Sequence, residues 1–202
     1  SLLDGRMIFN GAIFRSEYDD KQESILIPVD LSNVATVVRN ASSLEMTGLE
    51  LEVQYQLTEA WDVMATYGYL KSEYDDYIAD LSGDGVITDN SDLVPRNTPE
   101  NTFGLTTSYT ARVGNGDLKA RISYRFRDSM ESESQNNPLG SLDSIHNVNA
   151  NINYSINNYG ISVWGRNITD EREQRWSTIG GLTSRGWWNE PATYGVTLSA
   201  SF

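Results

Sequence analysis

The stretch Asn147–Ile156, NVNANINYSI, decides the fold. Asn or Ser stands at every odd position of this stretch, and Val, Ala, Ile or Tyr stands at every even one. Because successive residues of a β-strand point to opposite faces, the stretch predicts a strand with one polar and one apolar face. In a soluble protein the apolar face would be buried, whereas in an outer-membrane barrel it would meet lipid and the Asn row would line the lumen.

The same alternation recurs along the chain and predicts an all-β fold of about eight antiparallel strands. The regular segments are 48–57, 61–69, 102–110, 118–127, 147–156 and 194–202, and two less regular ones are 6–16 and 159–168. Helical periodicity is not apparent in any part of the sequence.

The connections between these segments alternate in length. Tight turns follow Leu57, Val113 and Ile156, whereas the long connections are rich in Asp, Ser, Asn and Gly. The long connections are 17–36, 72–100, 128–146 and 170–191. Short periplasmic turns at one end and long extracellular loops at the other are typical of outer-membrane barrels.

The aromatic residues of the apolar faces fall at two levels once all long loops are placed at one end. The level near the long loops contains Tyr67, Tyr69, Phe103, Tyr124, Phe126 and Tyr194, and the level near the turns contains Tyr55, Trp61, Tyr109, Tyr154 and Phe202. Aliphatic residues lie between the two levels. This double girdle predicts a transmembrane β-barrel segment whose apolar face contacts outer-membrane lipid and whose Asn row faces the lumen.

The composition excludes several other classes of protein. The 202 residues carry a net charge of −13, so no nucleic-acid partner is expected, because phosphate contacts require a basic surface. There is no Cys, which excludes a disulfide framework and a thiolate metal site. No apolar run approaches the roughly 18 residues of a transmembrane helix, and no signal peptide opens the sequence.

Five motifs, taken in order, resemble those of the TonB-dependent outer-membrane receptors. They are Asn40–Glu52 with its GLELE strand, Leu93–Pro99, Tyr124–Asp128, Asn167–Asp170 (NITD) and Pro191–Phe202. Ala192 stands where this family usually has Arg. The resemblance implies that residues 1–202 are the C-terminal part of a plugged barrel of about 22 strands in the bacterial outer membrane.

The resemblance also implies a function. Receptors of this family import a scarce nutrient, such as a ferric siderophore or an oligosaccharide, and a box near their N-terminus engages TonB. Neither the plug domain nor this box is visible in the sequence, so TonB would act through a missing N-terminal part. An enzyme is not expected, because His146, the only His, and Asn147 should point to opposite faces of one strand.

An alternative is a complete eight-stranded outer-membrane barrel with a structural or adhesion role. Eight strands can close around a lumen that is filled by side chains. In such a lumen the acidic side chains of Glu50, Glu52 and Asp62 would pair with the basic side chains of the segment 118–127.

Two groups of residues are candidate binding sites for a small-molecule ligand. The lumen face of the segment 118–127 carries four cations, which are Lys119, Arg121, Arg125 and Arg127. These cations either attract an anionic ligand such as a ferric siderophore or pair with carboxylates of the plug or of neighbouring strands. The last long loop contains Arg172, Arg175, Trp176, Arg185, Trp187 and Trp188. Exposed Trp and Arg side chains either stack on a flat ligand or hold the loop against its neighbours.

No cofactor is required, but the loop 80–92 predicts a calcium site of the EF-hand kind. The oxygen ligands would be Asp80, Ser82, Asp84, the carbonyl of Val86, Thr88 and Asp92. Gly85 matches the Gly of the sharp turn. The acid expected at the twelfth position comes one residue late, at Asp92, so the alternative is an acidic loop exposed to solvent.

Overall fold

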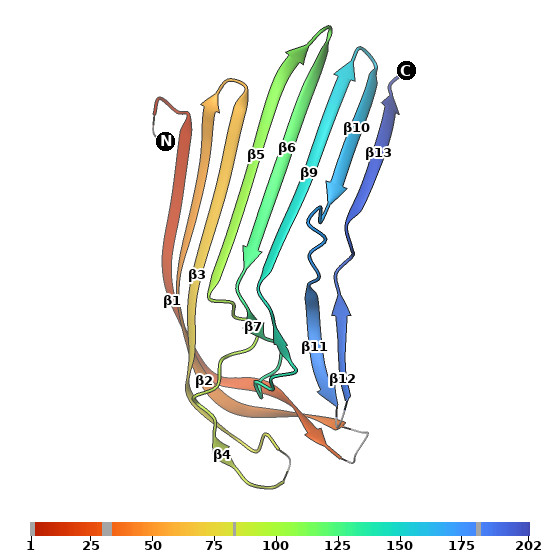
Figure 1. Cartoon of the computed structure of the whole chain (residues 1–202). Coiled ribbons are helices and arrows are strands. Elements are labelled where there is room, and N and C mark those ends of the chain that lie inside the picture. Colours follow the sequence, from red (N-terminus) through yellow and green to blue (C-terminus); the bar gives the residue numbers. More distant parts are fainter. Residues whose placement is uncertain (1–2, 30–33, 83, 181–182) are drawn as a thin grey trace.

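One large antiparallel sheet makes up most of the computed structural model, which describes residues 3–29, 34–82, 84–180 and 183–202 (Figure 1). Its long strands are β1 (Met7–Pro28), β2 (Val34–Thr58), β3 (Trp61–Ala79), β5 (Asn101–Val113), β6 (Gly116–Arg127), β9 (Ile145–Ile156), β10 (Tyr159–Arg166) and β13 (Thr193–Ala200). They lie in this order across the sheet, and each runs antiparallel to its neighbours. The predicted all-β fold with about eight long strands is confirmed. Among the described residues, none belongs to a helix long and apolar enough to cross a membrane.

Turns of two residues join the long strands at one end of the sheet, which is the top of Figure 1. These turns are Glu59-Ala60, Gly114-Asn115 and Asn157-Asn158. Gly114 and Asn157 have φ angles of 60° and 51°, which Gly and Asn adopt at little cost. The long connections lie at the other end, so the predicted separation of short turns from long loops is confirmed.

Short strands lie within the long connections. β4 (Thr88–Asp89) pairs with the end of β3, and β7 (Met130–Glu131) pairs with β8 (Ser141–Leu142). β11 (Gln174–Gly180) and β12 (Thr183–Trp188) form a separate hairpin. The sequence did not predict these elements, because short pairs outside the membrane lack the alternation that lipid contact imposes on the long strands.

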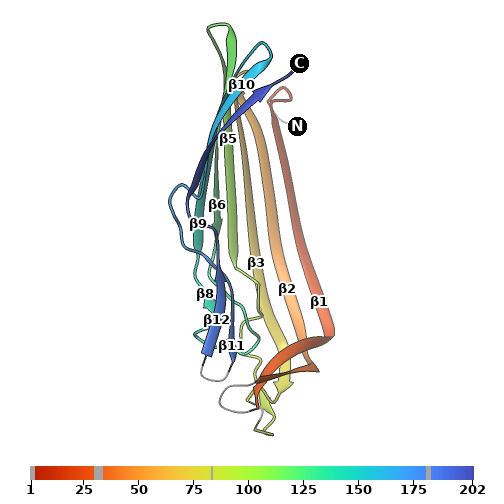
Figure 2. The same ribbon diagram turned by 90° about the vertical axis from the view of Figure 1, so that its right-hand side faces the viewer.

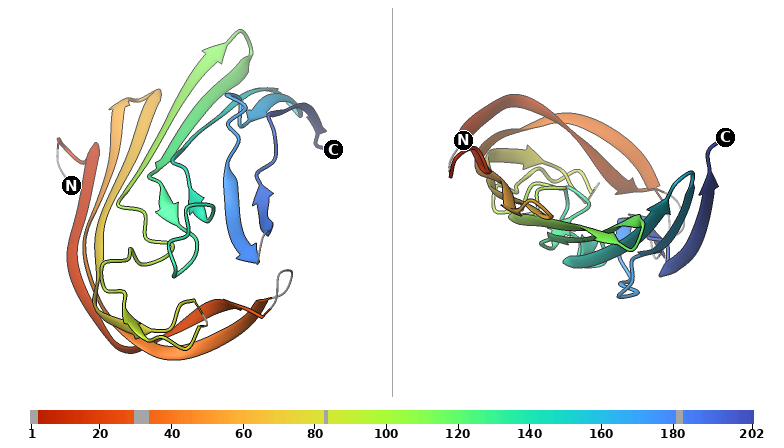
Figure 3. Two further views of the ribbon diagram at one scale, coloured as in Figure 1. Left: turned by 60° about the horizontal axis from the view of Figure 1, so that its bottom comes forward. Right: turned by 90° about the horizontal axis from the view of Figure 1, so that it is seen from above.

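The register places the apolar residues of neighbouring strands side by side. Ala65 of β3 is opposite Leu105 of β5, and Ile122 of β6 is opposite Ala150 of β9. This face is exposed, since Ile122 is 51% and Leu198 of β13 is 77% accessible. Figures 2 and 3 show the turn-side parts of the long strands as a single curved layer. The apolar residues therefore form one outer face, as a lipid-contacting surface requires.

The aromatic residues come into register at both predicted levels. Near the long loops, Tyr67 is opposite Phe103, which is in turn opposite Phe126. Near the turns, Trp61 is opposite Tyr109, and their rings meet edge to face with centroids 6.5 Å apart. Each level therefore runs across adjacent strands, as an interfacial girdle does.

The sheet is open. β1 pairs with β2 and β13 pairs with β10, and the described residues of β1 and β13 do not pair with each other. Figure 3 shows the resulting arc in a view along the strands. The described part of the chain therefore does not form the closed eight-stranded barrel that the sequence left as an alternative. The outer edges of β1 and β13 carry N–H and C=O groups that lipid cannot satisfy, so each edge needs a further strand in a membrane.

β1 and β2 continue well beyond the predicted strands. Residues 17–28 pair with 34–45, with an irregularity at Lys21, although the sequence predicted a loop over 17–36. Alternation ends here because neither face meets lipid, whereas the backbone ladder continues without it. The far end of this hairpin bends across the concave side of the sheet, where β1 contacts β11 (Figures 1 and 3).

The buried apolar residues lie at the loop-side end of the molecule. We call the loop-side ends of β1, β2 and β3, together with residues 80–82, 84–100 and 128–144, the cap. Its hydrophobic core consists of Leu44, Tyr74, Tyr77 and Ala79, with Met46, Leu81 and Leu93 packed against it. The rings of Tyr74 and Tyr77 lie 4.7 Å apart. The cap therefore has a core of its own, distinct from the lipid-facing wall.

Glu23 is completely buried in the cap and joins four segments of the chain. Its carboxylate forms ion pairs with Lys21 and, at 3.6 Å, with Arg96. The hydroxyls of Tyr74 and Ser134 donate hydrogen bonds to it at 3.0 and 2.6 Å. Burial raises the pKa of the Glu23 carboxyl, but the hydrogen bonds and the charge of Lys21 lower it more, so the net pKa lies below the ordinary value of 4.5.

We expect acid to destabilise the cap through Glu23. This residue lies outside the membrane, because it is about ten residues, or roughly 33 Å along β1, beyond the aromatic level near the long loops. The pKa of Glu23 is lower in the folded cap than in the unfolded chain. Its stabilising contribution is therefore complete above the ordinary pKa and is lost as the pH falls through 4.5 toward the folded-state value. Amide hydrogen exchange of residues 17–24 and 72–79 in the full-length protein, corrected for the intrinsic rate, should be faster at about pH 3.5 than at about pH 7.

The control for this experiment is Glu23→Gln, which keeps the shape and removes the charge. At neutral pH it should lower the local opening free energy by about 2 kcal/mol, and its exchange should respond less to acid. An equal acid response in the variant and the wild type would show that another group controls the cap.

A second prediction tests which face meets lipid. Ile122 and Ser123 are neighbours on β6 and point to opposite faces. Ile122→Arg should place a cation in lipid at a cost of about 2–4 kcal/mol and reduce assembly, whereas Ser123→Arg should place it in the lumen and be tolerated. The measurement is the heat-modifiable fraction of the full-length protein in isolated outer membranes. Normal assembly of the Ile122 variant would contradict the lipid-facing assignment.

Candidate functional site

The concave face of the sheet carries the polar rows of the alternating strands. On this face Arg125 of β6 lies opposite Gly104 of β5 and Asn147 of β9. A hollow of about 710 Å³ lies at the loop-side end of these strands. Strand residues of β3, β5, β6 and β9 form one wall, and Glu173 and Arg175 of the last long loop form the other. We call this region the arginine hollow.

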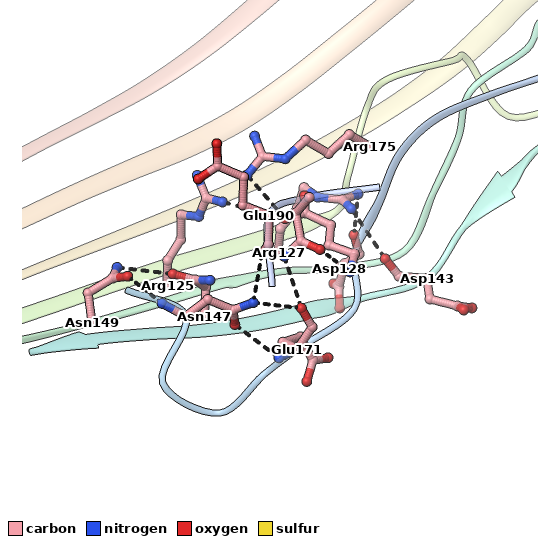
Figure 4. A network of polar contacts seen from close by, with 12 residues as sticks. Arg125, Arg127, Asp128, Asp143, Asn147, Asn149, Glu171, Arg175 and Glu190 are labelled. Atoms are coloured by element: carbon pink, nitrogen blue, oxygen red, sulfur yellow. Dashed lines mark hydrogen bonds and ion pairs between the residues drawn. The ribbon is translucent and has the colours of Figure 1, made fainter. Parts of the chain in front are cut away.

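Glu173 stands between two arginines of the arginine hollow. Its Oε2 atom lies 3.8 Å from Nη2 of Arg125 and 3.6 Å from Nη2 of Arg175, whose head groups approach each other in Figure 4. Glu173 is only 8% accessible, whereas the side chains of both arginines are more than half exposed. Its Oε2 atom is buried and accepts no hydrogen bond from the described residues. Charge attraction alone therefore holds this oxygen, at distances longer than a hydrogen bond.

Arg127 also lines the arginine hollow, but its contacts differ. Its guanidinium donates to the carbonyl oxygens of Asp128 at 3.0 Å and of Asp143 at 3.2 Å (Figure 4). These bonds hold the two ends of the connection between β6 and β9. Arg127 therefore supplies charge to the hollow and also fixes its rim.

The other two predicted cations of β6 lie nearer the turns. Lys119 is opposite Asn153 and Arg121 is opposite Asn151 on β9. On β5 they lie opposite Thr110 and Ser108, so their neighbours in the sheet are uncharged polar residues. The acidic residues of β2 lie three strands away from β6. The structure thus divides the predicted basic row into a pair at the hollow and a pair nearer the turns.

The NITD motif holds the base of the last long loop. The buried side chain of Asn167 donates to the carbonyls of Glu171 at 2.9 Å and Glu190 at 3.1 Å, and its Oδ1 accepts from the N–H of Glu171 at 2.9 Å (Figure 4). Oδ1 of Asp170 accepts from the N–H of Ala192 at 2.9 Å. The outgoing and returning chains of the loop are therefore tied together where they leave the sheet.

Two further asparagines extend this network to Glu173 and to β9. The N–H of Glu173 donates to Oδ1 of Asn189 at 3.0 Å, and the N–H of Asn189 donates to the carbonyl of Glu173 at 2.9 Å. Oδ1 of Asn149 accepts from the N–H of Asn167 at 2.9 Å, and its amide donates to Asn147 at 3.0 Å. The backbone of Glu173 is thereby fixed relative to the sheet.

Sequence reasoning did not name Asn167 or Glu173 as site residues. Glu173 is one of several acids in the loop 170–191, and no local pattern distinguishes it. A signal for Asn167 was present in its motif, and its φ of 49° is one that Asn tolerates better than most residues.

The structure distributes the six loop candidates over two places. Arg175 lines the arginine hollow. The candidates that do not line it are Arg172, Trp176, Arg185, Trp187 and Trp188. Trp176 and Trp187 pair across the β11–β12 hairpin with ring centroids 5.3 Å apart, and Trp187 is 72% accessible.

Ser177 attaches the β11–β12 hairpin to the cap. Its side chain is completely buried and donates to the carbonyl of Leu139 at 2.9 Å, while the hydroxyl of Ser132 donates to the carbonyl of Ser177 at 2.8 Å. Trp176 precedes Ser177 on the strand and therefore points to the opposite face of the hairpin. The exposed Trp pair is left on the face away from this attachment.

The predicted calcium loop is closed by hydrogen bonds of its own. Oδ2 of Asp80 accepts from the N–H of Gly85 at 2.9 Å, and Oδ1 of Asp84 accepts from the N–H of Val86 at 2.8 Å. Gly85 has a φ of 88°, as the sharp turn requires, and Gly83 lies outside the described residues. Within the described ranges, no three His, Cys, Asp or Glu side chains are grouped so that they could hold a metal. Calcium binding stays a prediction.

His146 lies on the lipid side, away from the polar row. Its Nδ1 is 2.8 Å from the hydroxyl of Tyr124, and its ring lies 5.0 Å from that of Phe126. Asn147 instead contacts Asn149 on the concave face. The two residues therefore point apart, as the alternation predicted.

These features define a class of protein: the chain is a segment of an outer-membrane β-barrel with a polar, partly basic lumen. The family model described as "TonB dependent receptor-like, beta-barrel" matches residues 2–168, well over half of the chain, and the chain belongs to this family. Its members are outer-membrane receptors and transporters of Gram-negative bacteria rather than enzymes, which agrees with the resemblance seen in the five motifs.

Solved structures of similar fold include the ferric yersiniabactin uptake receptor FyuA from Yersinia pestis, with a TM-score of 0.76 and 16% identity over 98% of this chain. The siderophore receptor PiuA from Acinetobacter baumannii has a TM-score of 0.71 and 22% identity over 98%. The ferric-catecholate import receptor Fiu from E. coli K12 has a TM-score of 0.69 and 22% identity over 100%. The chain spans 28%, 26% and 26% of these three proteins, about a quarter of each.

We expect Asn167 to control the order of the last loop. Asn167→Ala removes three hydrogen bonds to partly buried backbone groups and places Ala at a positive φ, and the loop base should lose about 3 kcal/mol of stability. Amide exchange of residues 171–190 should become faster in the full-length receptor, while that of β9 should not change. Asn167→Gly is the matched control, because it keeps the backbone freedom and removes only the hydrogen bonds. If only the Ala variant loosened the loop, backbone strain rather than the amide contacts would be the cause.

Proposed function

We propose that residues 1–202 are the C-terminal part of the barrel of a receptor that imports a scarce nutrient in a TonB-dependent manner. The two open edges of the sheet and the quarter share of the similar structures support this proposal. The plug domain and the TonB box would belong to a preceding part of the receptor. TonB would engage that part, and outer-membrane lipid would contact the convex face.

The ligand that the geometry supports best is a ferric siderophore or a similar anionic chelate. The observation that carries this is the arginine hollow, where Arg125 and Arg175 flank the carboxylate of Glu173 and Arg127 lines the same wall. A cationic hollow with low-dielectric walls raises the local concentration of anions. Ferric complexes of catecholate and carboxylate chelators carry negative charge. The receptors for ferric yersiniabactin and ferric catecholates among the similar structures support the same class.

An oligosaccharide is the second candidate ligand. Trp187 and Trp188 are 72% and 60% accessible, and Trp176 stacks near Trp187. Exposed aromatic rings of this kind stack on sugar rings as well as on flat chelates. We also propose, from the sequence pattern alone, that the loop 80–92 binds calcium.

The test is growth of a strain in which the full-length receptor is the only ferric-siderophore receptor. The panel contains anionic ferric chelates, a neutral ferric hydroxamate and oligosaccharides, each with and without a working TonB. We expect growth on an anionic ferric chelate that requires TonB. Arg125→Ala combined with Arg175→Ala should raise the concentration for half-maximal uptake at least about tenfold, because charge-assisted contacts to the ligand are lost.

Arg112→Ala is the matched control, because Arg112 pairs with Asp117 at 3.2 Å beside a turn at the far end of the sheet. Its uptake should equal that of the wild type. Trp187→Ala with Trp188→Ala should also weaken uptake without loss of assembly. Growth on oligosaccharides alone would refute the anionic chelate and support the second candidate ligand. Uptake that is independent of TonB would refute the proposed function.

A further inference from the structure

The position of Glu173 in the arginine hollow is that of a bound anion. Its carboxylate lies between Arg125 and Arg175, one from the rigid sheet and one from the loop. We infer that Glu173 is an internal substitute for the anionic group of the ligand. It offsets part of the positive charge of the two arginines in the empty receptor and is displaced when a ligand carboxylate or catecholate binds them. The inference rests on the proposed function in one respect, that the ligand is an anion.

The distances favour displacement by a free anion. Oε2 of Glu173 is 3.6 and 3.8 Å from the two guanidinium nitrogens, whereas a good N⁺–H···O⁻ bond is about 2.7–2.9 Å long. The side chain is attached to a backbone that Asn189 holds on both its N–H and its carbonyl. The fixed backbone therefore keeps the Glu173 carboxylate from forming a short hydrogen bond with either arginine. A free ligand anion has no such restraint and can form these short bonds.

The burial of Glu173 also favours displacement. Its Oε2 atom is removed from water and accepts no hydrogen bond from the described residues, so the desolvation cost of this oxygen is only partly offset. The two arginines are more than half exposed and face a hollow of about 710 Å³, so a ligand can reach them without a change in the sheet.

Displacement of Glu173 would also change the mobility of the last long loop. Arg125 stands on β6 and Glu173 directly precedes β11, so this pair is a charge link between the barrel wall and the last long loop. An anion that takes Arg125 removes this link, while Asn167 still holds the base of the loop to the sheet. The expected result is a loosened β11–β12 hairpin above an intact base.

Citrate is the probe for the experiment, since it presents several carboxylates and no metal. Its binding to the purified full-length receptor is measured by titration calorimetry at low ionic strength. Glu173→Gln should bind citrate about tenfold more tightly than the wild type, because the competing charge is gone. Adding Arg125→Ala should remove this gain. Glu171→Gln is the matched control, since its carboxylate points away from the arginines in Figure 4, and it should bind as the wild type does.

A fixed structural role predicts the opposite result. If Glu173 only anchors the loop, Glu173→Gln will bind citrate no more tightly than the wild type, and this outcome overturns the inference. Absence of citrate binding in both proteins overturns it as well. Should Glu173→Gln not assemble, Glu173→Asp retains the charge but retracts it by one methylene, and about threefold tighter binding is expected. In the wild type, citrate should also speed amide exchange of residues 174–177.

The two proposals can fail separately. Import of an anionic ferric chelate with unchanged citrate binding in Glu173→Gln would leave the proposed function intact and remove only the role of Glu173. Import of oligosaccharides alone, with tighter citrate binding in Glu173→Gln, would remove the anionic ligand from both proposals and leave only the competition of Glu173 with free anions.

Discussion

The pairing of backbone groups in a solvent without water is the constraint on which the rest of this structure depends. An unpaired N–H or C=O in lipid is costly, so each spanning strand must have a neighbour on both sides over its whole membrane depth. The continuous order from β1 to β13 meets this requirement everywhere except at the two outer edges. The period of two follows from the same ladder, because a strand that is paired at both sides can present its side chains only to lipid or to the lumen.

Because of this constraint, the wall in lipid and the cap outside the membrane are stabilised in different ways. The wall has no buried apolar layer, and the residues that would form a core in a soluble protein, such as Ile122 and Leu198, are exposed. Beyond the membrane, water competes for backbone hydrogen bonds and the hydrophobic effect operates again. The apolar core around Tyr74 and Tyr77 is found there, together with the buried Glu23.

The same division explains what the sequence could predict. All eight long strands were predicted because lipid on one side forces alternation, as in Asn147–Ile156. The loop-side parts of β1 and β2 were not, because residues 17–28 and 34–45 pair through the backbone with no lipid to impose a pattern. In the site, the cations of β6 were predicted from the polar row of a strand. Glu173 was not, because its place between Arg125 and Arg175 results from a loop fold and from contacts with Asn189, which no local pattern encodes.

Surface loops usually vary independently of one another, since insertions and substitutions in one seldom disturb the next. The buried carboxylate of Glu23 removes part of that freedom, because it contacts residues of the first hairpin, of β3 and of the loops that carry Arg96 and Ser134. A substitution at any of these positions removes or alters a contact of the Glu23 carboxylate, which is buried and has no water to replace that contact. Relatives of this receptor should therefore exchange the four segments as a set, with sequence diversity concentrated at the loop tips and correlated substitutions at the positions that surround residue 23.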